Sequence, residues 1–295
     1  MILGKFTCNI CGAENDSGAD TEERERATCT GCSSSARFRA VILSLSRALF
    51  GSDLALCQFP QLKSIRGLGV SDSDIYSDRL AGCFSYTNTF YHQEPDFDLS
   101  CPDVTEFGRY DFVICSDVLE HVPPPVERSF DTLSRLLNPT GVLILTVPYA
   151  TQSATIERFP QSSEYGIADI NGRPVLVNRS PDGSYQVFDD LSFHGGTGAT
   201  LERRVFSQAD LRAHLKAAGL DEVRFMTEGN PAFGVVLNGE CSLPIVAARQ
   251  PFALRTSAIR EMVGQLTTAR EVINAAKRSR WVRVGRLLGV GPRIS

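Results

Sequence analysis

The chain has 295 residues, of which 42% are hydrophobic and 22% charged, and its formal net charge is −4. This balance excludes wholesale disorder, and no apolar run approaches the ~20 residues that a membrane helix needs. Residues 251–295 carry nine Lys/Arg and two Glu, a charge of +7, which leaves −11 on residues 1–250. An acidic body of this kind argues against general nucleic-acid binding. The amino terminus lacks a secretory signal pattern, so we expect a cytoplasmic protein.

Four cysteines near the amino terminus form two Cys-x-x-Cys pairs with 17 residues between them. Each pair can present two thiolates to a metal, and two pairs complete a tetrahedral site that is typical of structural zinc. The predicted ligands are Cys8, Cys11, Cys29 and Cys32. An iron centre in the same cage and coincidental surface thiols are the alternatives. We expect zinc to stabilise this segment, because so short a piece of chain cannot bury much core.

A helix is predicted over Ala36–Phe50, where apolar residues recur at helical spacing. The serines before it can cap its first turn, and Gly51 ends it. Arg37 and Arg39 can meet an anionic substrate, although solvated charges on a helix are commoner. We expect this helix to join the zinc segment to the domain that follows.

Residues 62–91 read as strand, helix and strand. Leu62–Val70 is the first strand, and its Gly67-Leu68-Gly69 segment suits either a ligand-binding turn or an ordinary turn from strand to loop. Asp74–Gly82 is a plausible short helix. Phe84–Tyr91 alternates and is rich in β-forming residues, so it is predicted as the second strand.

Residues 109–149 read as strand, loop, helix, tight turn and strand. Phe112–Cys115 and Val142–Val147 are short apolar runs, typical of strands that are buried on both faces. Between them, Val126–Leu137 has one apolar face, and Asn138-Pro139-Thr140-Gly141 ends that helix. Two strands joined in this way form a parallel pair with a right-handed crossover.

The sequence of this stretch resembles the middle of class I S-adenosylmethionine-dependent methyltransferases. The segments that carry the resemblance are YDFVICSDVLEHV and LLNPTGVLILTVPY. In that family the first segment covers the fourth strand and its loop, and the second covers the fifth strand. The resemblance implies an α/β, doubly wound, Rossmann-like fold with a mostly parallel seven-stranded sheet. It also implies that S-adenosylmethionine lies across the carboxyl ends of strands one, two and four.

The resemblance further implies a set of cofactor-binding positions. These are the glycine turn beside the methionyl group, the end of the second strand beside the ribose, a loop acid beside the adenine, and the end of the fourth strand. In this chain the positions are Gly67, Gly69, Ser71, Asp72, Asn88, Thr89, Asp98, Leu99, Ser116 and Asp117. Two of the family's acids are missing, because Ile65 stands at the first and no carboxylate ends the second strand. Asp98 can equally be a loop acid that makes a turn.

Residues 150–200 form an insertion, which we expect to be a small antiparallel flap over the active-site mouth. The segment PVLVN followed by Arg-Ser-Pro-Asp-Gly predicts a hairpin within it. His194 is followed by two glycines and is our first candidate for a general base, with a hydrogen-bonded loop histidine as the alternative. His121 is the second candidate, although in relatives its segment mostly shapes the loop.

The remaining segments complete the sheet and add a tail. Ser207 begins a helix that resembles the one before strand six, and Asp221–Thr227 and Val235–Leu237 are predicted as strands six and seven. Ala253–Ser279 is predicted as a long helix. The basic segment Trp281–Leu288 suits a membrane surface or a partner, or it packs on its own domain or a dimer mate.

We therefore predict a zinc knuckle over residues 1–35, a methyltransferase domain over residues 36–250 with its flap at residues 151–200, and a basic helical tail over residues 251–295. The predicted activity is O-methylation of a small polar metabolite or a sugar or glycan precursor, with S-adenosylmethionine as cofactor and a structural Zn²⁺. A catalytically silent scaffold that binds a partner is the alternative, which the two missing acids favour. A nicotinamide-dependent enzyme fits less well, because the final glycine of that fingerprint is absent.

Overall fold

A six-stranded sheet forms the centre of the computed structural model, which describes residues 4–16, 24–26, 28–102, 104–159, 164–180, 182–194, 200–237 and 241–279. The strand order is β15-β16-β6-β5-β3-β4. These strands are β3 (Leu62–Val70), β4 (Phe84–Thr89), β5 (Tyr110–Ser116), β6 (Leu137–Thr146), β15 (Glu222–Phe225) and β16 (Ile245–Ala248). Strands β4, β3, β5 and β6 pair in parallel, whereas β16 pairs antiparallel with both β6 and β15.

This arrangement confirms the predicted α/β, Rossmann-like fold with a mostly parallel sheet. Within the described residues the main sheet has six strands and not the predicted seven. The strand predicted at Val235–Leu237 is wrong, because that segment makes only an isolated bridge between Asn230 and Val235. The antiparallel strand is Ile245–Ala248, whose four residues are all buried because both faces of the sheet are covered: Ile245 and Ala247 pack in the apolar cluster of α3 and α4, and Val246 packs in that of α1 and α2.

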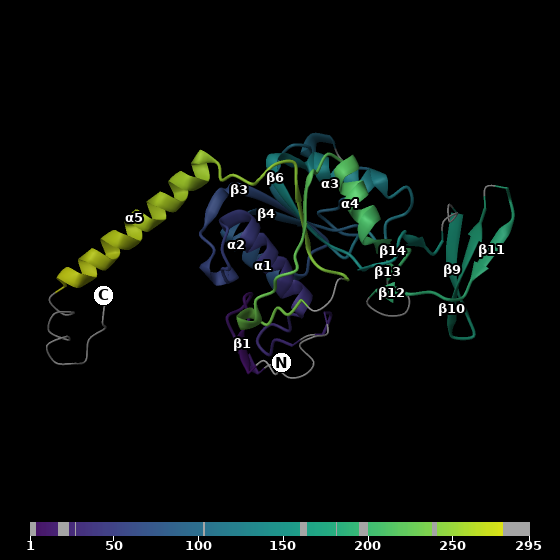
Figure 1. Cartoon of the computed structure of the whole chain (residues 1–295), viewed down its shortest axis with the longest axis horizontal. Coiled ribbons are helices and arrows are strands. Elements are labelled where there is room, and N and C mark those ends of the chain that lie inside the picture. Colours follow the sequence, from purple (N-terminus) through teal and green to yellow (C-terminus); the bar gives the residue numbers. More distant parts are fainter. Residues whose placement is uncertain are drawn as a thin grey trace.

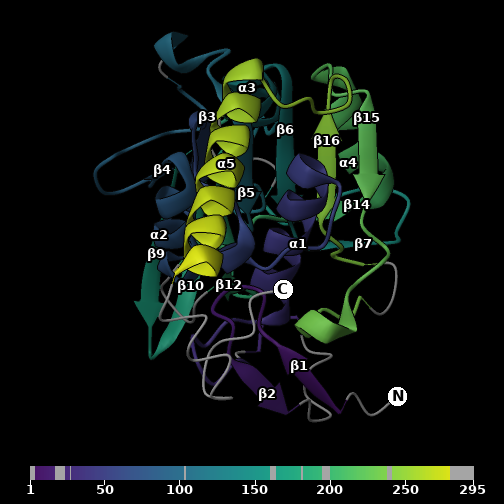
Figure 2. The same ribbon diagram turned by 90° about the vertical axis from the view of Figure 1, so that its left-hand side faces the viewer.

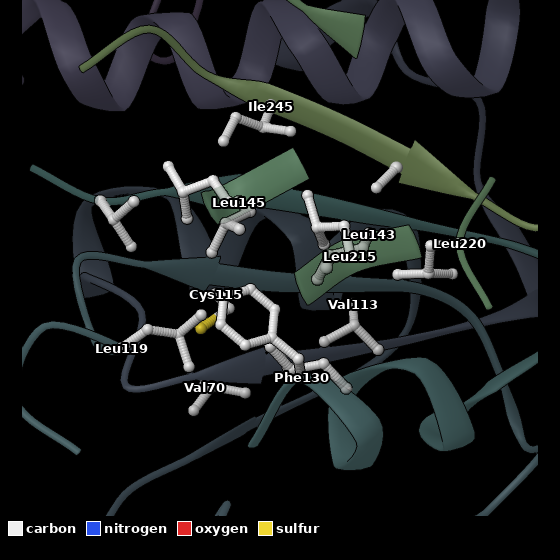
Figure 3. Packing of buried hydrophobic residues seen from close by; sticks show 14 of the residues in the cluster. Val70, Val113, Cys115, Leu119, Phe130, Leu143, Leu145, Leu215, Leu220 and Ile245 are labelled. Atoms are coloured by element: carbon white, nitrogen blue, oxygen red, sulfur yellow. The ribbon is translucent and has the colours of Figure 1, made fainter. Parts of the chain in front are cut away.

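Helices cover both faces of the sheet (Figure 1). Helices α1 (Ala36–Phe50) and α2 (Asp74–Cys83) pack in one apolar cluster with one face, and α3 (Glu127–Leu136) and α4 (Gln208–Ala217) pack in another. Alternate residues of β5 point into the two layers, as the pleat of a strand requires. Val113 and Cys115 belong to the α3/α4 layer (Figure 3), whereas Phe112 and Ile114 belong to the α1/α2 layer.

The local signals at helix ends are confirmed most clearly in α1. The Ser35 hydroxyl accepts the Phe38 N–H at 3.4 Å, and Gly51 ends the helix with a positive φ of 64°. The helix ends before residues 138–141, as predicted, but these residues belong to β6 and not to a separate tight turn. The register between β5 and β6 shifts at this point, and that irregularity accommodates the extra residues.

An antiparallel hairpin of β1 (Lys5–Thr7) and β2 (Glu14–Asp16) begins the described chain. Figure 2 shows this hairpin at one end of the molecule, below the main sheet. Short 3₁₀ turns complete the connections at η2 (Leu56–Gln58), η3 (Val104–Glu106) and η4 (Pro231–Phe233).

The insertion forms small sheets of its own. Its strands, with β14 after it, are β7 (Tyr149–Ala150), β8 (Ile156–Glu157), β9 (Glu164–Ile170), β10 (Arg173–Arg179), β11 (Tyr185–Phe188), β12 (Phe193–His194), β13 (Thr200–Leu201) and β14 (Arg204–Ser207). The predicted hairpin is present, since β10 pairs antiparallel with β11. The β9–β11 sheet projects from the main sheet (Figure 1), and Leu176 of β10 packs with Leu201 of the hairpin β12–β13. The carbonyl of Leu201 contacts His121 in the loop after β5. A role for the insertion as a flap over the active-site mouth stays a prediction.

Helix α5 (Thr256–Arg278) extends away from the domain, on the side opposite the β9–β11 sheet (Figure 1). Only Ala258 of this helix is buried. In the described part of the chain, no helix is both long and apolar enough to cross a membrane. The predicted contact segment Trp281–Leu288 lies outside the described residues, so its role stays a prediction.

Candidate cofactor site and cysteine cluster

The carboxyl ends of β3, β4 and β5 meet at one edge of the sheet. Val70 of β3 pairs with Thr89 of β4 on one side and with Cys115 of β5 on the other. The residues that follow these strands therefore lie side by side. In open α/β sheets this edge is where ligands bind.

The loop after β3 carries a buried acid. Ser71 has a φ of 58° and turns the chain so that Asp72 points back into the domain. The Tyr76 hydroxyl donates to Asp72 Oδ1 at 2.8 Å, and the Tyr86 hydroxyl donates to Oδ2. Burial raises the pKa of Asp72 to about 7, although both phenol hydrogen bonds act in the opposite direction.

Gly67 and Gly69 do not form the predicted turn, because both lie within β3. A Cβ on Gly67 would collide with the ring of Phe112, and a Cβ on Gly69 would lie 2.6 Å from Asp72 Oδ2. These glycines therefore make room for the protein's own side chains. The turn itself is formed by Ser71 and Asp72.

The polar end of β4 is bound to the loop after β3. Asn88 Oδ1 accepts the Asp72 N–H at 2.9 Å, and Asn88 Nδ2 donates to the Asp72 carbonyl at 2.8 Å. Thr89 Oγ1 donates to the Gly69 carbonyl at 2.8 Å. Both predicted ribose-binding side chains thus hold neighbouring backbone.

Asp98 makes a turn, which was the alternative considered for it. Its Oδ1 accepts the backbone N–H of Ser100 at 2.8 Å and the Ser100 hydroxyl at 2.6 Å. The neighbouring side chain of Leu99 is buried in the core cluster of the α3/α4 layer. A role for this pair beside the adenine stays a prediction.

The loop after β5 begins with Asp117, whose side chain is 1% exposed and whose φ is 54°. The Arg24 guanidinium donates to both carboxylate oxygens, at 2.7 and 3.0 Å, and Arg37 Nε lies 3.1 Å from Oδ2. Thr146 Oγ1 donates to Oδ1 at 2.8 Å. Burial alone would raise the pKa of Asp117, but the charges of Arg24 and Arg37 outweigh it and lower the pKa. The predicted site residue Ser116 lies beside this group and accepts from Arg37 Nη1 at 2.6 Å.

The side chains of Arg37 and Arg39 are buried, so the interpretation of both as solvent-exposed charges on the helix is wrong. Arg39 donates to the carbonyls of Ser34 and Gly234 at 2.8 and 2.9 Å. A signal for Arg37 was present in the sequence, because position 37 falls on the same helical face as Val41 and Leu45. No comparable signal marked Arg24, whose partner is 93 residues away.

Glu120 and His121 follow on the same loop. Glu120 is 0% exposed, and neither of its carboxyl oxygens has a hydrogen-bond partner among the described residues. Burial, and then the charge of Asp117, raises its pKa well above the ordinary value. His121 Nδ1 lies 2.9 Å from the Leu201 carbonyl, and Nε2 lies 3.7 Å from Glu120 Oε1. Both ring nitrogens face protein groups, which agrees with a role in shaping the loop.

The backbone of His194 pairs with Thr200 in the hairpin β12–β13. Its side chain and residues 195–199 lie outside the described part of the chain. The hairpin is close to the loop after β5, because Leu201 accepts from His121 and Arg203 N–H donates to the Glu120 carbonyl at 2.8 Å.

The four amino-terminal cysteines come together as predicted. The sulfur atoms of Cys8, Cys11, Cys29 and Cys32 all lie within 4.8 Å of one another. Two compact Cys-x-x-Cys turns present them, and four sulfur ligands at this spacing suit a tetrahedral metal. Beside the cluster is the buried, positively charged guanidinium of Arg39, which donates to the hydroxyl of Ser34 at 3.3 Å, and that hydroxyl lies 3.4 Å from Cys8 Sγ. That charge would offset part of the negative charge of a metal–thiolate centre, so the residues fit such a group.

Comparison with known proteins finds similarity to methyltransferases. A family model described as a methyltransferase domain matches residues 70–224. A ubiquinone biosynthesis O-methyltransferase of Marinobacter nauticus is 25% identical over 163 residues, which are 55% of this chain and 56% of that relative. The chain therefore spans little more than half the length of this curated relative.

Two solved structures illustrate the structural similarity. An S-adenosylmethionine-dependent methyltransferase from Clostridium acetobutylicum is 12% identical, with a TM-score of 0.37, over 62% of this chain and 82% of the other. A sugar N-methyltransferase from Streptoalloteichus is 14% identical, with a TM-score of 0.40, over 81% of this chain and 94% of the other.

Proposed function

We propose that this chain methylates a hydroxyl group of a small polar acceptor. The chain belongs to the methyltransferase domain family of S-adenosylmethionine-dependent methyltransferases, and the proposal proceeds from that membership. The observation that carries this proposal is the polar edge formed by Asp72, Asn88 and Asp117, which lies within the residues that the family model matches. The proposed acceptor class, a sugar or glycan precursor, rests on the resemblance of this layout, a cysteine knuckle followed by an Arg-x-Arg helix, to bacterial methyltransferases. The name of the Marinobacter relative, an O-methyltransferase, supports oxygen as the acceptor atom.

The cofactor would lie across the ends of β3, β4 and β5. The backbone N–H groups of Ser73 and Asp74, at the start of α2, can bind its anionic methionyl carboxylate, because those of Ile75 and Tyr76 already donate to Ser73. Asp72 supports the same placement, because its carboxyl lies directly over Gly69, at the end of β3. When bound, the cofactor supplies an intrinsically reactive methyl sulfonium, and the protein mainly has to align the acceptor with it.

The acceptor hydroxyl must lose its proton as its oxygen is methylated, and a nearby histidine can take that proton. His194 is the first candidate, supported by the position of its hairpin beside the loop after β5. His121 is the second candidate. Its support is weaker, because its ring nitrogens already lie beside the Leu201 carbonyl and the Glu120 carboxyl.

We also propose that the four cysteines hold a structural Zn²⁺. A site with four sulfur ligands has no open position for a substrate, so its role would be to fold the amino-terminal segment. The burial of Cys8 and Cys29 and the neighbouring charge of Arg39 support this proposal.

The proposal is tested with the purified full chain and S-adenosylmethionine that carries a labelled methyl group. The acceptors are a panel of monosaccharides, nucleotide sugars and catechols, with matched amino sugars as controls. We expect label on oxygen in at least one hydroxylated acceptor. Label only on amino sugars would contradict a hydroxyl acceptor, and no transfer to any of them would favour a silent scaffold.

The base is tested in the same assay. His194→Ala should lower turnover by about 10²-fold or more, with the affinity for S-adenosylhomocysteine unchanged. His92→Ala is the matched control, because His92 is exposed on a loop. Unchanged turnover in His194→Ala, with a large loss in His121→Ala, would assign the base to His121.

A further inference from the structure

Hydrogen bonds connect the cysteine cluster to Ser34, which directly precedes the residue that caps α1. The backbone N–H groups of Thr28 and Cys29 donate to the Ser34 carbonyl at 3.1 and 3.3 Å. The Ser34 hydroxyl lies 3.4 Å from Cys8 Sγ, so both cysteine pairs contact this residue. The next residue, Ser35, caps α1. The geometry of the cluster therefore sets where α1 begins.

The same turn brings two arginines together. The Arg37 N–H donates to the Arg24 carbonyl at 3.0 Å. Glu25 binds both side chains, with Oε1 2.5 Å from Arg24 Nη1 and Oε2 2.8 Å from Arg37 Nε. Arg24 lies between the two cysteine pairs in the sequence, and Arg37 follows the second pair by five residues. Both guanidiniums thus take their positions from the cluster.

The guanidinium groups of both arginines contact Asp117, at the carboxyl end of β5, where the cofactor is proposed to bind. Arg24 binds the two carboxylate oxygens as a fork, and Arg37 approaches Oδ2 while also donating to Ser116. A carboxylate this deeply buried is stable only with paired charges around it. Asp117 begins the loop that carries Glu120 and His121, so the arginines fix the start of that loop.

We infer that Arg24 and Arg37 are positioning residues that couple metal binding at the cysteine cluster to nucleoside binding at the carboxyl ends of β3 and β5. This inference rests on the proposed function. A loaded cluster holds Ser34 and the start of α1, and α1 holds the arginines on Asp117. Coupling of this kind is reciprocal, so the nucleoside must also strengthen metal retention.

The first measurement uses calorimetry with S-adenosylhomocysteine on the full chain, either loaded with Zn²⁺ or stripped by a chelator. We expect at least a tenfold weaker affinity in the stripped protein and in Arg24→Gln and Arg37→Gln. In these two variants, stripping should cause less than a further twofold loss. Arg47→Gln is the matched control on α1, because Arg47 pairs with Asp53 near the surface and is remote from Asp117. Arg37→Lys should recover part of the affinity, because it keeps the charge but not the planar fork.

The second measurement keeps the inference testable if the stripped protein unfolds. Release of Zn²⁺ to a chromogenic chelator is followed with and without S-adenosylhomocysteine, and Co²⁺ absorption confirms that each variant retains its four-sulfur site. The nucleoside should slow release at least fivefold in the wild type and in Arg47→Gln, but less than twofold in Arg24→Gln.

The possible outcomes distinguish a failure of the proposed coupling from a failure of the proposed function. No binding of S-adenosylhomocysteine to the loaded wild type would contradict the proposed function itself. Binding that is unchanged by stripping and by both substitutions would contradict the coupling alone. Tighter binding in Arg24→Gln would also contradict it, because Arg24 would then compete with the nucleoside.

Discussion

Two buried carboxyl groups lie at the ends of adjacent strands, and their charges are set in opposite ways. Asp72, after β3, is surrounded by the hydroxyls of Tyr76 and Tyr86, and its pKa is raised to about 7. Asp117, after β5, is surrounded by two guanidiniums, and its pKa is lowered. Both acids are buried, and both follow a strand of the main sheet. Their charge depends on partners that other elements supply.

The largest expected effect comes from removing the carboxylate between the two guanidiniums. Asp117→Ala would leave the buried charge of Arg37 without its principal partner, and we expect the free energy of unfolding to fall by about 3–5 kcal/mol. Urea denaturation measures this change. Asp131→Ala, which breaks an exposed pair with Arg135, should cost about 0.5 kcal/mol or less. Equal losses in the two variants would contradict the difference between buried and exposed pairs.

The pH dependence of stability should separate the two acids. The folded protein keeps the Asp72 proton up to about pH 7, whereas the unfolded chain loses it near pH 4. Folding then binds a proton, so this contribution is full below about pH 4 and is lost as the pH rises toward 7. The contribution of Asp117 has the opposite sign. It is present at neutral pH and is lost as the pH falls below about 4.

Asp72→Asn tests this sign directly, because the amide cannot titrate. Between pH 4 and pH 7, the unfolding free energy of the wild type should fall relative to that of Asp72→Asn by a few kcal/mol. Denaturation at several pH values measures the difference between the two slopes. Parallel slopes would show that Asp72 titrates normally in the folded protein.

Crowding around Asp72 predicts the next effect. Gly69→Ala would push a methyl group against Asp72 and the Tyr86 hydroxyl, and we expect a loss of about 1–3 kcal/mol. Gly82→Ala is the matched control. It has open space around its Cβ and lies in α2, so it should be neutral or stabilising by about 0.5–1 kcal/mol. A tolerated Gly69→Ala would mean that the polar cluster is loosely packed.

The smallest effect is expected from removing one hydroxyl. Tyr86→Phe deletes a hydrogen bond to Asp72 and should cost about 0.5–1.5 kcal/mol. Because that bond lowers the pKa of Asp72, the same change should raise the pKa further. Carbon-13 NMR of the Asp72 carboxyl measures the shift, and Tyr91→Phe on an exposed side chain provides the baseline. A lower pKa in Tyr86→Phe would contradict this description.

The sequence predicted the elements whose signals are local. The helix over Ala36–Phe50 and the strand over Leu62–Val70 have the predicted bounds, because capping serines, glycine and apolar spacing act within a few residues. The four sulfur atoms also meet, since two short turns already pair them. The predicted seventh strand failed because Ile245–Ala248 is a four-residue run whose role depends on its neighbours in the sheet.

The candidate site was predicted less completely. Asp72, Asn88 and Asp117 lie together at the predicted edge. The glycine turn did not form, because Gly67 and Gly69 lie inside β3, paired with β4 on one side and with β5 on the other. The partners that set the charge of the site were missed. Arg24 reaches Asp117 across 93 residues, a contact that periodicity and spacing cannot indicate.

A crystal structure of the Zn²⁺-loaded full chain with S-adenosylhomocysteine tests the central claim most directly. We predict electron density for the nucleoside across the ends of β3, β4 and β5, with its amino-acid part beside Ser71 and Asp72. Density elsewhere, or an edge filled only by Arg24 and the neighbouring side chains at saturating nucleoside, would contradict the account.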